Sequence, residues 1–297
     1  MPKRPSISLF FPAWNEEDYV ERAVTRALTV LPRLTDDFEI IIVNDASTDR
    51  TREIADDLAA RIPQVRAIHH EVNLKLGGAM RTGFGASTKD IVVYSDIDLP
   101  FDFTELERAL HLMDYLEADM ICAFRFDRTS EGLKRIVYSF AYNLLIRTLF
   151  GVHVKDINFS FKVIRRRVLT ALELKSTGSL IDAELVVKTV RRGYRVAQIG
   201  VDYFPRTRGI STLSSPAVIV KILRELATLR SEMRAASSPA RPAPALTVVS
   251  GSKPVLPPPT GGALPALAVL EGDGSARQAI EEGVLQAASM ASSQFFG

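Results

Sequence analysis

Short apolar runs that alternate with amphipathic segments constrain this chain most strongly. The runs are rich in β-branched and aromatic residues, and we expect them to form strands at 7–11, 38–43, 65–69, 91–95 and 118–123. Helical spacing predicts helices between them, at 16–31, 49–61, 78–87 and 103–116. Such alternation is typical of a doubly wound, mostly parallel sheet flanked by helices. The predicted fold class is therefore α/β, with ligands at the carboxyl ends of the strands.

The composition of the chain changes near residue 235. Residues 236–297 are rich in Pro, Ala, Ser and Gly and have no sustained hydrophobic period, so they bury too little apolar surface to offset the entropy of ordering the chain. Residues 216–235 have the spacing of an amphipathic helix, and its apolar stripe is formed by Ile219, Ile222, Leu223, Leu226, Leu229 and Met233. We expect one folded domain over 5–215, then this helix, then a flexible tail.

Charge and rare residues exclude several classes of protein. Lys and Arg number 37 against 35 Asp and Glu, and this balance argues against a dedicated nucleic-acid binder. The single cysteine, Cys122, cannot form an intramolecular disulfide. The four histidines, His69 and His70 among them, have no metal-binding or triad partner at a recognisable spacing, so we expect packing or surface roles for them. No signal peptide and no apolar stretch of roughly 18 residues is found, which predicts a cytoplasmic protein that does not span the membrane.

Polar or glycine-rich segments follow three of the expected strands. The first strand leads into 12–17, the second into 44–49, and the third into 73–83. A carboxylate just beyond a strand, such as that of Asp45, can accept hydrogen bonds from a base or a ribose. Paired glycines let backbone amides approach a phosphate or a sugar at a helix N-terminus. Each segment also has a structural interpretation, as a helix start, a turn-forming Asp and a glycine turn.

Two aspartates two residues apart end the fourth expected strand. In an extended chain Asp96 and Asp98 point the same way, and their like charges repel unless a cation or a proton neutralises them. Hard carboxylate oxygens suit Mg²⁺ or Mn²⁺, which complete their coordination with water and substrate phosphates. This pair is the sharpest functional signal in the sequence, and its structural alternative is a solvated acidic turn.

Together, these four segments resemble those of the family 2 glycosyltransferases. The family has the GT-A fold, a Rossmann-like, doubly wound, mostly parallel sheet in a single catalytic domain, and the resemblance covers about residues 5–215. Within the family the chain looks most like the polyprenyl-phosphate sugar synthases, because of Arg125 and the segments 134–143 and 156–162. Pro100 stands where many members have Gln.

The resemblance implies a donor site for a nucleotide diphosphate sugar, a UDP- or GDP-hexose. Its nucleotide-sugar contacts would come from Pro12, Ala13, Asn15, Glu17, Asp45, Lys75, Gly77, Asp96 and Arg208. Asp96 and Asp98 would hold Mg²⁺ or Mn²⁺ on the diphosphate, and a loop with Arg206 and Arg208 would close over it.

The resemblance also implies a site for a lipid phosphate, formed by Arg125, Arg135 and Ser139. Helical spacing supports it, because Arg135, Ser139 and Asn143 share one face of the helix expected over 134–149. Arg binds phosphate oxygens in pairs, and Ser and Asn add hydrogen bonds. A solvated basic stripe is the alternative interpretation of this face.

The reaction that the resemblance implies is inverting transfer of a hexose to a polyprenyl phosphate. Its candidate catalytic residues are Asp98, Arg135, Asp156 and Arg206. A phosphate acceptor is already anionic, so Asp156 would act as a base only if the acceptor were a hydroxyl.

Two other functions fit the same sequence. One is transfer to a hydroxyl acceptor in cell-envelope glycan synthesis, and the other is a non-catalytic nucleotide-sugar-binding or scaffold protein. The helix at 216–235 would either hold the protein peripherally at the inner face of the membrane or pack on the domain.

Overall fold

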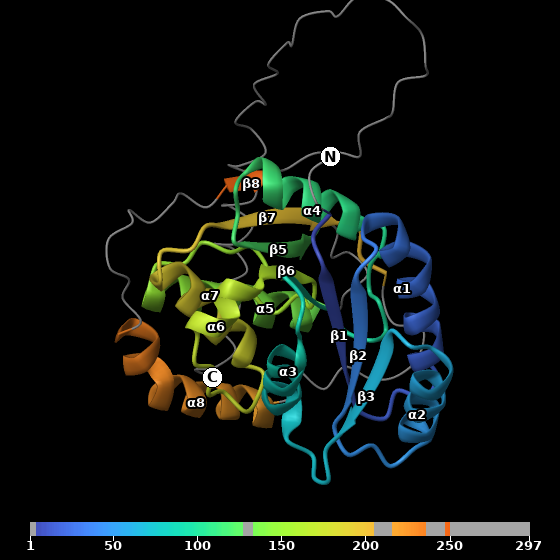
Figure 1. Cartoon of the computed structure of the whole chain (residues 1–297). Coiled ribbons are helices and arrows are strands. Elements are labelled where there is room, and N and C mark those ends of the chain that lie inside the picture. The colour runs from blue at the N-terminus through green and yellow to red at the C-terminus, as the bar shows by residue number, and fades with distance from the viewer. Residues whose placement is uncertain (1–3, 127–132, 205–215, 236–246, 250–297) are drawn as a thin grey trace, which may run out of the picture. The chain divides into compact units, whose positions relative to one another are not determined.

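The computed structural model describes residues 4–126, 133–204, 216–235 and 247–249, all within one compact unit (Figure 1). An eight-stranded sheet has the order β3-β2-β1-β4-β6-β5-β7-β8, in which β6 alone runs antiparallel to its neighbours. The strands are β1 (Ile7–Ala13), β2 (Phe38–Asn44), β3 (Val65–His69), β4 (Ile91–Tyr94), β5 (Met120–Arg125), β6 (Lys162–Arg165), β7 (Val196–Val201) and β8 (Thr247–Val249). This arrangement confirms the predicted α/β class.

Helices cover both faces of the sheet. They are α1 (Val20–Leu34), α2 (Thr51–Arg61), α3 (Lys75–Ala86), α4 (Glu105–Tyr115), α5 (Leu133–Phe150), α6 (Arg166–Ala171), α7 (Ile181–Arg191) and α8 (Pro216–Ala235). One apolar cluster joins α1, α2 and α4 to one face, and a second joins α3, α5, α7 and α8 to the other. Along β1, Leu9 and Phe11 enter the first cluster, whereas Phe10 enters the second. Because both faces are buried, the run from Ile40 to Val43 in β2 and the whole of β4 are continuously apolar.

The second half of the sheet contains strands that the sequence analysis did not assign. β6 has only four residues, Lys162 and Arg165 among them, and it inserts between β4 and β5. Because β6 runs in the opposite direction, the segment that precedes it lies at the carboxyl edge, the edge where the parallel strands end. This places the segment 151–161 beside the ends of β4 and β5.

The C-terminal helix α8 packs on the domain through its described apolar side chains. Ile222, Leu226 and Met233 are buried in the second cluster. Glu225 accepts hydrogen bonds from the hydroxyls of Ser176, at 3.0 Å, and Thr177, at 2.7 Å. Of the alternatives for this helix, the structure therefore shows packing on the domain for these residues. Among the described helices, none combines the length and the apolar character that a membrane span requires.

Candidate active site

Asp96 and Asp98 lie in a tight turn that follows strand β4. The amide of Leu99 donates to the carbonyl oxygen of Asp96 at 3.2 Å, and Leu99 has a φ of 46°, so the chain turns directly after the strand. Asp96 and Asp98 are both half-buried. The turn replaces the extended geometry expected from the sequence, and it keeps both residues at the carboxyl edge of the sheet.

Three carboxylates approach the buried hydroxyl of Tyr94 at the end of β4. The hydroxyl donates to Oδ1 of Asp96 at 3.4 Å, and the ring stacks on Phe10 with the centroids 5.4 Å apart. Burial raises the pKa of Tyr94 well above its usual range, and the charges of Asp96, Asp182 and Asp98 raise it further. The hydroxyl therefore stays protonated at neutral pH, and the region around it is strongly acidic.

The acidic pair fits a divalent cation that is shared with a diphosphate. Within the described residues, no group of three or more His, Cys, Asp or Glu side chains is arranged to hold a metal by itself. Mg²⁺ beside nucleotides characteristically uses one or two carboxylates and takes its remaining ligands from water and phosphate. Asp96 and Asp98 could supply these two carboxylates.

A buried lysine balances part of this negative charge. Lys162 is 1% exposed, and its Nζ donates to Asp182 of α7 and to the carbonyl oxygen of Phe159, the latter at 2.8 Å. It also lies 5.5 Å from the ring centroid of Tyr94. Burial raises the pKa of Asp182, and the Lys162 ammonium offsets only part of that effect. The lysine thus places a buried positive charge beside Tyr94 and Asp182.

Arg125 and Asp156, which were predicted to act on the acceptor, bind each other. Nε of Arg125 lies 2.7 Å from Oδ2 of Asp156, and Nη2 lies 3.1 Å from Oδ1, so the guanidinium engages both carboxylate oxygens. Both side chains are buried, and the guanidinium carbon lies 5.6 Å from the ring centroid of Phe159 and 5.3 Å from that of Tyr203. In this arrangement Asp156 orients Arg125, a role that the sequence analysis did not foresee.

On the donor side, Asn15 and Glu17 join the first two strand-end loops. Oδ1 of Asn15 accepts from the amide of Thr48 at 2.8 Å, and Oε2 of Glu17 accepts from the amide of Arg50 at 3.0 Å. Asn15 has a positive φ of 55°, a conformation that Asn adopts more readily than most residues. These contacts fix the shape of the loops that were predicted to hold the nucleotide.

Asp45 joins the segments that follow β1, β2 and β3. Its amide donates to the carbonyl oxygen of Ala13 at 2.8 Å, and its Oδ1 accepts from the amide of Leu74 at 2.7 Å. Nδ1 of His70 lies 2.7 Å from the same Oδ1. Sequence reasoning missed His70, although it stands directly after β3 as Asp45 stands after β2, and this position was the available signal. Pro12, which is half-buried, and Ala13 end β1 beside this group.

The glycine pair at 77 and 78 serves packing. A Cβ at residue 77 would lie 2.3 Å from the carbonyl oxygen of Ser176, and the amide of Gly77 donates to the carbonyl oxygen of Thr177 at 3.1 Å. A Cβ at residue 78 would lie 2.4 Å from Cβ of Leu74. Close approach by protein atoms therefore explains both glycines, and a contact of Gly77 with the nucleotide sugar stays a prediction. Lys75, in contrast, is exposed at the start of α3.

Helix α5 contains residues that the sequence analysis predicted to bind the acceptor. Nδ2 of Asn143 donates to the carbonyl oxygen of Ser139 at 2.9 Å, and Oδ1 accepts from the amide of Ile157 at 3.1 Å. Asn143 thereby joins α5 to the segment that contains Asp156, and Ser139 lies one turn before it. The side chain of Arg135 lies outside the described residues, as do Arg206 and Arg208.

Solved structures with a similar fold show which fold this chain has. Glucosyl-3-phosphoglycerate synthase from Mycobacterium tuberculosis, in complex with Mn²⁺, UDP-glucose and phosphoglyceric acid, is 20% identical. Its TM-score is 0.57, and the match covers 76% of this chain and 80% of that one. A complex of the same enzyme with UDP is 21% identical, with a TM-score of 0.56. The fold is that of the GT-A glycosyltransferases.

Sequence relatives identify the family. The model described as Glycosyl transferase family 2 matches residues 8–172, and this chain belongs to that family. Glycosyltransferase AglD of Haloferax volcanii is 34% identical over 207 residues, which are 67% of this chain and 33% of that protein. The chain thus spans about one third of the length of this relative.

Two shorter relatives match over more of their own length. The polyprenol monophosphomannose synthase of Mycolicibacterium smegmatis is 27% identical over 69% of this chain and 80% of its own. The undecaprenyl-phosphate mannosyltransferase of Micrococcus luteus is 27% identical over 70% of this chain and 87% of its own. These findings confirm that the chain is a glycosyltransferase, as the sequence motifs predict.

Proposed function

We propose that this glycosyltransferase transfers a hexose from a nucleotide diphosphate sugar to a polyprenyl phosphate, with inversion at the anomeric carbon. The observation that carries the proposal is the acidic pair, Asp96 and Asp98, at the same edge of the sheet from which the apolar helix α5 begins. The names of the two shorter relatives, a polyprenol monophosphomannose synthase and an undecaprenyl-phosphate mannosyltransferase, support a lipid phosphate as the acceptor.

In this proposal the donor lies over the joined loops. Asp45 contacts the nucleoside, and the backbone geometry that Asn15 and Glu17 impose shapes its pocket. Asp96 and Asp98 would hold Mg²⁺ or Mn²⁺, which would supply positive charge to offset the negative charge that develops on a departing nucleoside diphosphate. Arg206 and Arg208 are proposed to contact the same diphosphate, where positive charge favours departure of the leaving group.

The acceptor phosphate attacks the anomeric carbon from the opposite face. A phosphate oxygen of the acceptor forms the new bond to the anomeric carbon. At the same time the bond between that carbon and the nucleoside diphosphate breaks, and its electron pair leaves with the nucleoside diphosphate. The acceptor oxygen is already anionic, so no base is required. This agrees with the engagement of both Asp156 oxygens by Arg125. Arg125, Arg135 and Ser139 then serve to position the phosphate.

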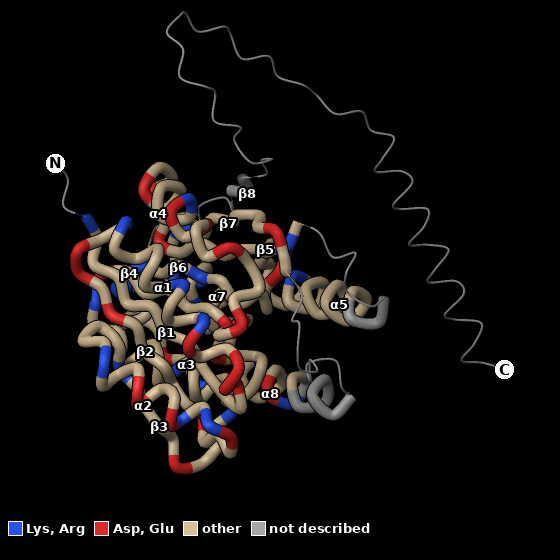
Figure 2. Tube along the Cα trace, turned by 90° about the vertical axis from the view of Figure 1, so that its right-hand side faces the viewer, with Lys and Arg blue, Asp and Glu red and all other residues tan. Residues whose placement is uncertain are grey.

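A lipid acceptor requires contact with a membrane surface, and α5 provides the best-placed apolar face. Among its described side chains, the exposed large hydrophobic ones are Val137, Tyr138, Phe140 and Leu144. Five further exposed apolar residues follow carboxyl ends of strands, namely Trp14, Val72, Leu74, Phe126 and Phe204. The helix contains no acidic residue (Figure 2). We therefore propose that α5, and not the packed side of α8, meets the lipid.

The central experiment is a transfer assay with labelled UDP- and GDP-hexoses and a polyprenyl phosphate, with and without EDTA. Label that moves into the organic phase only when a divalent cation is present supports the proposal. Transfer to a soluble hydroxyl acceptor, with none to the lipid phosphate, would contradict it. Binding of UDP or GDP without any transfer or hydrolysis would instead indicate a non-catalytic binding protein.

A sedimentation assay with anionic vesicles tests the lipid-facing surface. Phe140→Asp is expected to reduce the bound fraction several-fold, because a charge replaces an apolar side chain at the interface. Tyr115→Asp is the matched control, since Tyr115 is 85% exposed but ends α4, at the opposite edge of the sheet. Equal loss in both variants would refute a specific role for α5.

A further inference from the structure

The carboxylate of Asp45 is held through one of its two oxygens. Oδ1 accepts hydrogen bonds from the amide of Leu74 and from Nδ1 of His70, both at 2.7 Å. The backbone oxygen of Asp45 accepts from Nδ2 of Asn73 at 3.1 Å. Within the described part of the chain, no hydrogen bond reaches Oδ2. The side chain is 5% exposed, so its orientation is fixed by these contacts.

His70 is the side chain that hydrogen-bonds to Oδ1 of Asp45. A carboxylate only accepts hydrogen bonds, so the Nδ1 that faces it carries the proton. Nε2 lies 2.9 Å from the hydroxyl of Thr82 in α3, and a hydroxyl can either donate or accept. The ring is therefore held at both nitrogens, with a side-chain exposure of 9%. His70 links the end of β3 to Asp45 on one side and to α3 on the other.

A single available carboxylate oxygen discriminates between nucleobases. The ring edge of uracil presents one donor, N3–H, between two carbonyl acceptors. Guanine presents two adjacent donors, N1–H and N2–H, which a carboxylate satisfies best with both oxygens. Because Oδ1 already accepts from two protein donors, guanine would leave one of its donors without an equivalent partner, and such a loss is costly in a buried site.

We propose that His70 is a positioning residue that reserves Oδ2 of Asp45 for one donor of the base and thereby selects a uridine over a guanosine nucleotide. The inference rests on the proposed function, because it takes Asp45 to contact the nucleoside. It goes beyond the proposed function because it names the nucleotide, a uridine diphosphate, and the residue, His70, that makes the site prefer it.

Two isosteric variants separate positioning from packing. In His70→Asn, the side-chain amide nitrogen can occupy the place of Nδ1 and keep the contact with Asp45, while the contact with Thr82 is lost. In His70→Gln, the amide nitrogen can reach the place of Nε2, so the Thr82 contact is kept and the Asp45 contact is lost. Each variant removes one of two hydrogen bonds, and a thermal melt checks that both fold.

The measurement is calorimetric titration of the full chain with UDP and with GDP in the presence of Mn²⁺. We expect the wild type to bind UDP at least about tenfold more tightly than GDP. His70→Gln is expected to weaken UDP binding about tenfold and to reduce the ratio of UDP affinity to GDP affinity. His70→Asn is expected to keep both the UDP affinity and this ratio. Thr82→Val is expected to keep the preference as well.

The outcomes test the proposed function separately from the nucleotide selection by His70. A wild type that binds neither nucleotide would overturn the proposed function, and this inference with it. A wild type that binds GDP as well as or better than UDP would overturn the selection while leaving the glycosyltransferase proposal intact. An unchanged preference in His70→Gln would overturn the role of His70, and an equal loss in His70→Asn and His70→Gln would assign His70 to packing alone.

Discussion

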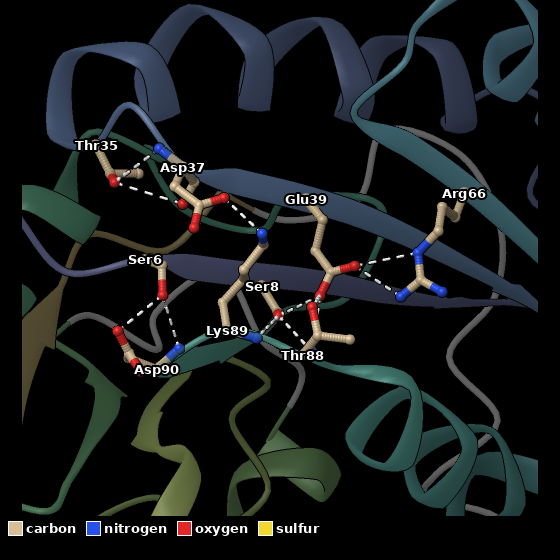
Figure 3. Close-up of polar contacts among 9 residues, drawn as sticks. All are labelled: Ser6, Ser8, Thr35, Asp37, Glu39, Arg66, Thr88, Lys89 and Asp90. Atoms are coloured by element: carbon tan, nitrogen blue, oxygen red, sulfur yellow. Dashed lines mark hydrogen bonds and ion pairs between the residues drawn. The ribbon is translucent and has the colours of Figure 1, made fainter.

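A carboxylate lies near each end of strand β2, that of Glu39 at the start and that of Asp45 just after the end. The two differ in how many of their oxygens accept hydrogen bonds from the protein. At the amino edge of the sheet, where the parallel strands begin, both oxygens of Glu39 are occupied (Figure 3). Oε1 accepts from the hydroxyl of Ser8 at 2.6 Å and from the amide and hydroxyl of Thr88, each at 2.8 Å. Oε2 accepts from Arg66 at 2.6 and 3.1 Å. At the carboxyl edge, the described contacts of Asp45 use Oδ1 alone.

The difference separates carboxylates that stabilise the fold from those that remain able to bind. Burial by itself raises the pKa of Glu39, but the hydrogen bonds from Ser8, Thr88 and Arg66 outweigh it, so the pKa lies below its usual value. At the carboxyl edge the reverse holds for Asp182, whose pKa burial raises. Concentrated negative charge there is a cost to stability that a cation or a ligand can relieve.

The largest effect on stability is expected from Lys162→Met. This variant tests whether the buried positive charge of Lys162 is needed to stabilise the carboxylates at the carboxyl edge. Removing one partner of a buried ion pair leaves Asp182 uncompensated and costs about 3–5 kcal/mol. Urea denaturation measures the loss. Lys89→Met is the control, because Lys89 pairs with the exposed Asp37 at the amino edge and should cost at most about 1 kcal/mol. Equal losses would remove the distinction between the edges.

Asp98→Ala tests the binding side of the comparison. If Asp98 holds a cation on the diphosphate, kcat for hexose transfer should fall about 10²–10³-fold, equivalent to about 2.7–4 kcal/mol of transition-state stabilisation. Binding of Mn²⁺, followed by electron paramagnetic resonance in the presence of UDP, should weaken as well. Full activity in Asp98→Ala would refute the metal role.

Glu39→Gln tests the stabilising side. The substitution should cost about 1–3 kcal/mol at pH 7, because buried donors lose a charged acceptor, and it should leave kcat of the folded enzyme unchanged. The pKa of Glu39 is lower in the folded state than its usual 4.5, so its stabilisation is present above that pH and is lost as the pH falls through the folded value. Unfolding curves of wild type and variant should therefore converge below about pH 4.5. A constant difference at all pH values would contradict this.

The smallest effect is expected from Ser6→Ala. Ser6 and Asp90 exchange hydrogen bonds of 2.9 and 3.0 Å at the amino edge, but these two hydrogen bonds are exposed, so water can replace the lost partner. The free energy of unfolding should change by no more than about 0.5–1 kcal/mol, and nucleotide affinity should not change. A larger change would show that the amino edge influences the site.

The sequence indicated the first half of the sheet reliably because buried parallel strands are continuously apolar. It did not indicate β6, whose Lys162 looks incompatible with a buried strand until its partner, Asp182, is known. That partner lies 20 residues away and on another element, and nothing in local spacing pairs the two.

The predicted site residues lie at the expected edge of the sheet, but their pairing with one another was not predicted. Strand ends alone located Asp45, Asp96 and Asp98. The pairing of Arg125 with Asp156, 31 residues apart, depends on β6 running antiparallel between β4 and β5. His70 was assigned to a packing or surface role because partners were sought at sequence spacings, whereas its partner Asp45 follows the neighbouring strand β2, 25 residues away.

The attachment of α8 limits how far this chain can be shortened. Glu225 binds the hydroxyls of Ser176 and Thr177, and the carbonyl of Thr177 in turn accepts from the amide of Gly77 in α3. A truncation at residue 215 would uncover the second apolar cluster and would also release the loop on which α3 rests. Since α3 carries Thr82, which supports His70, the shortest fragment expected to retain nucleotide affinity extends through residue 235.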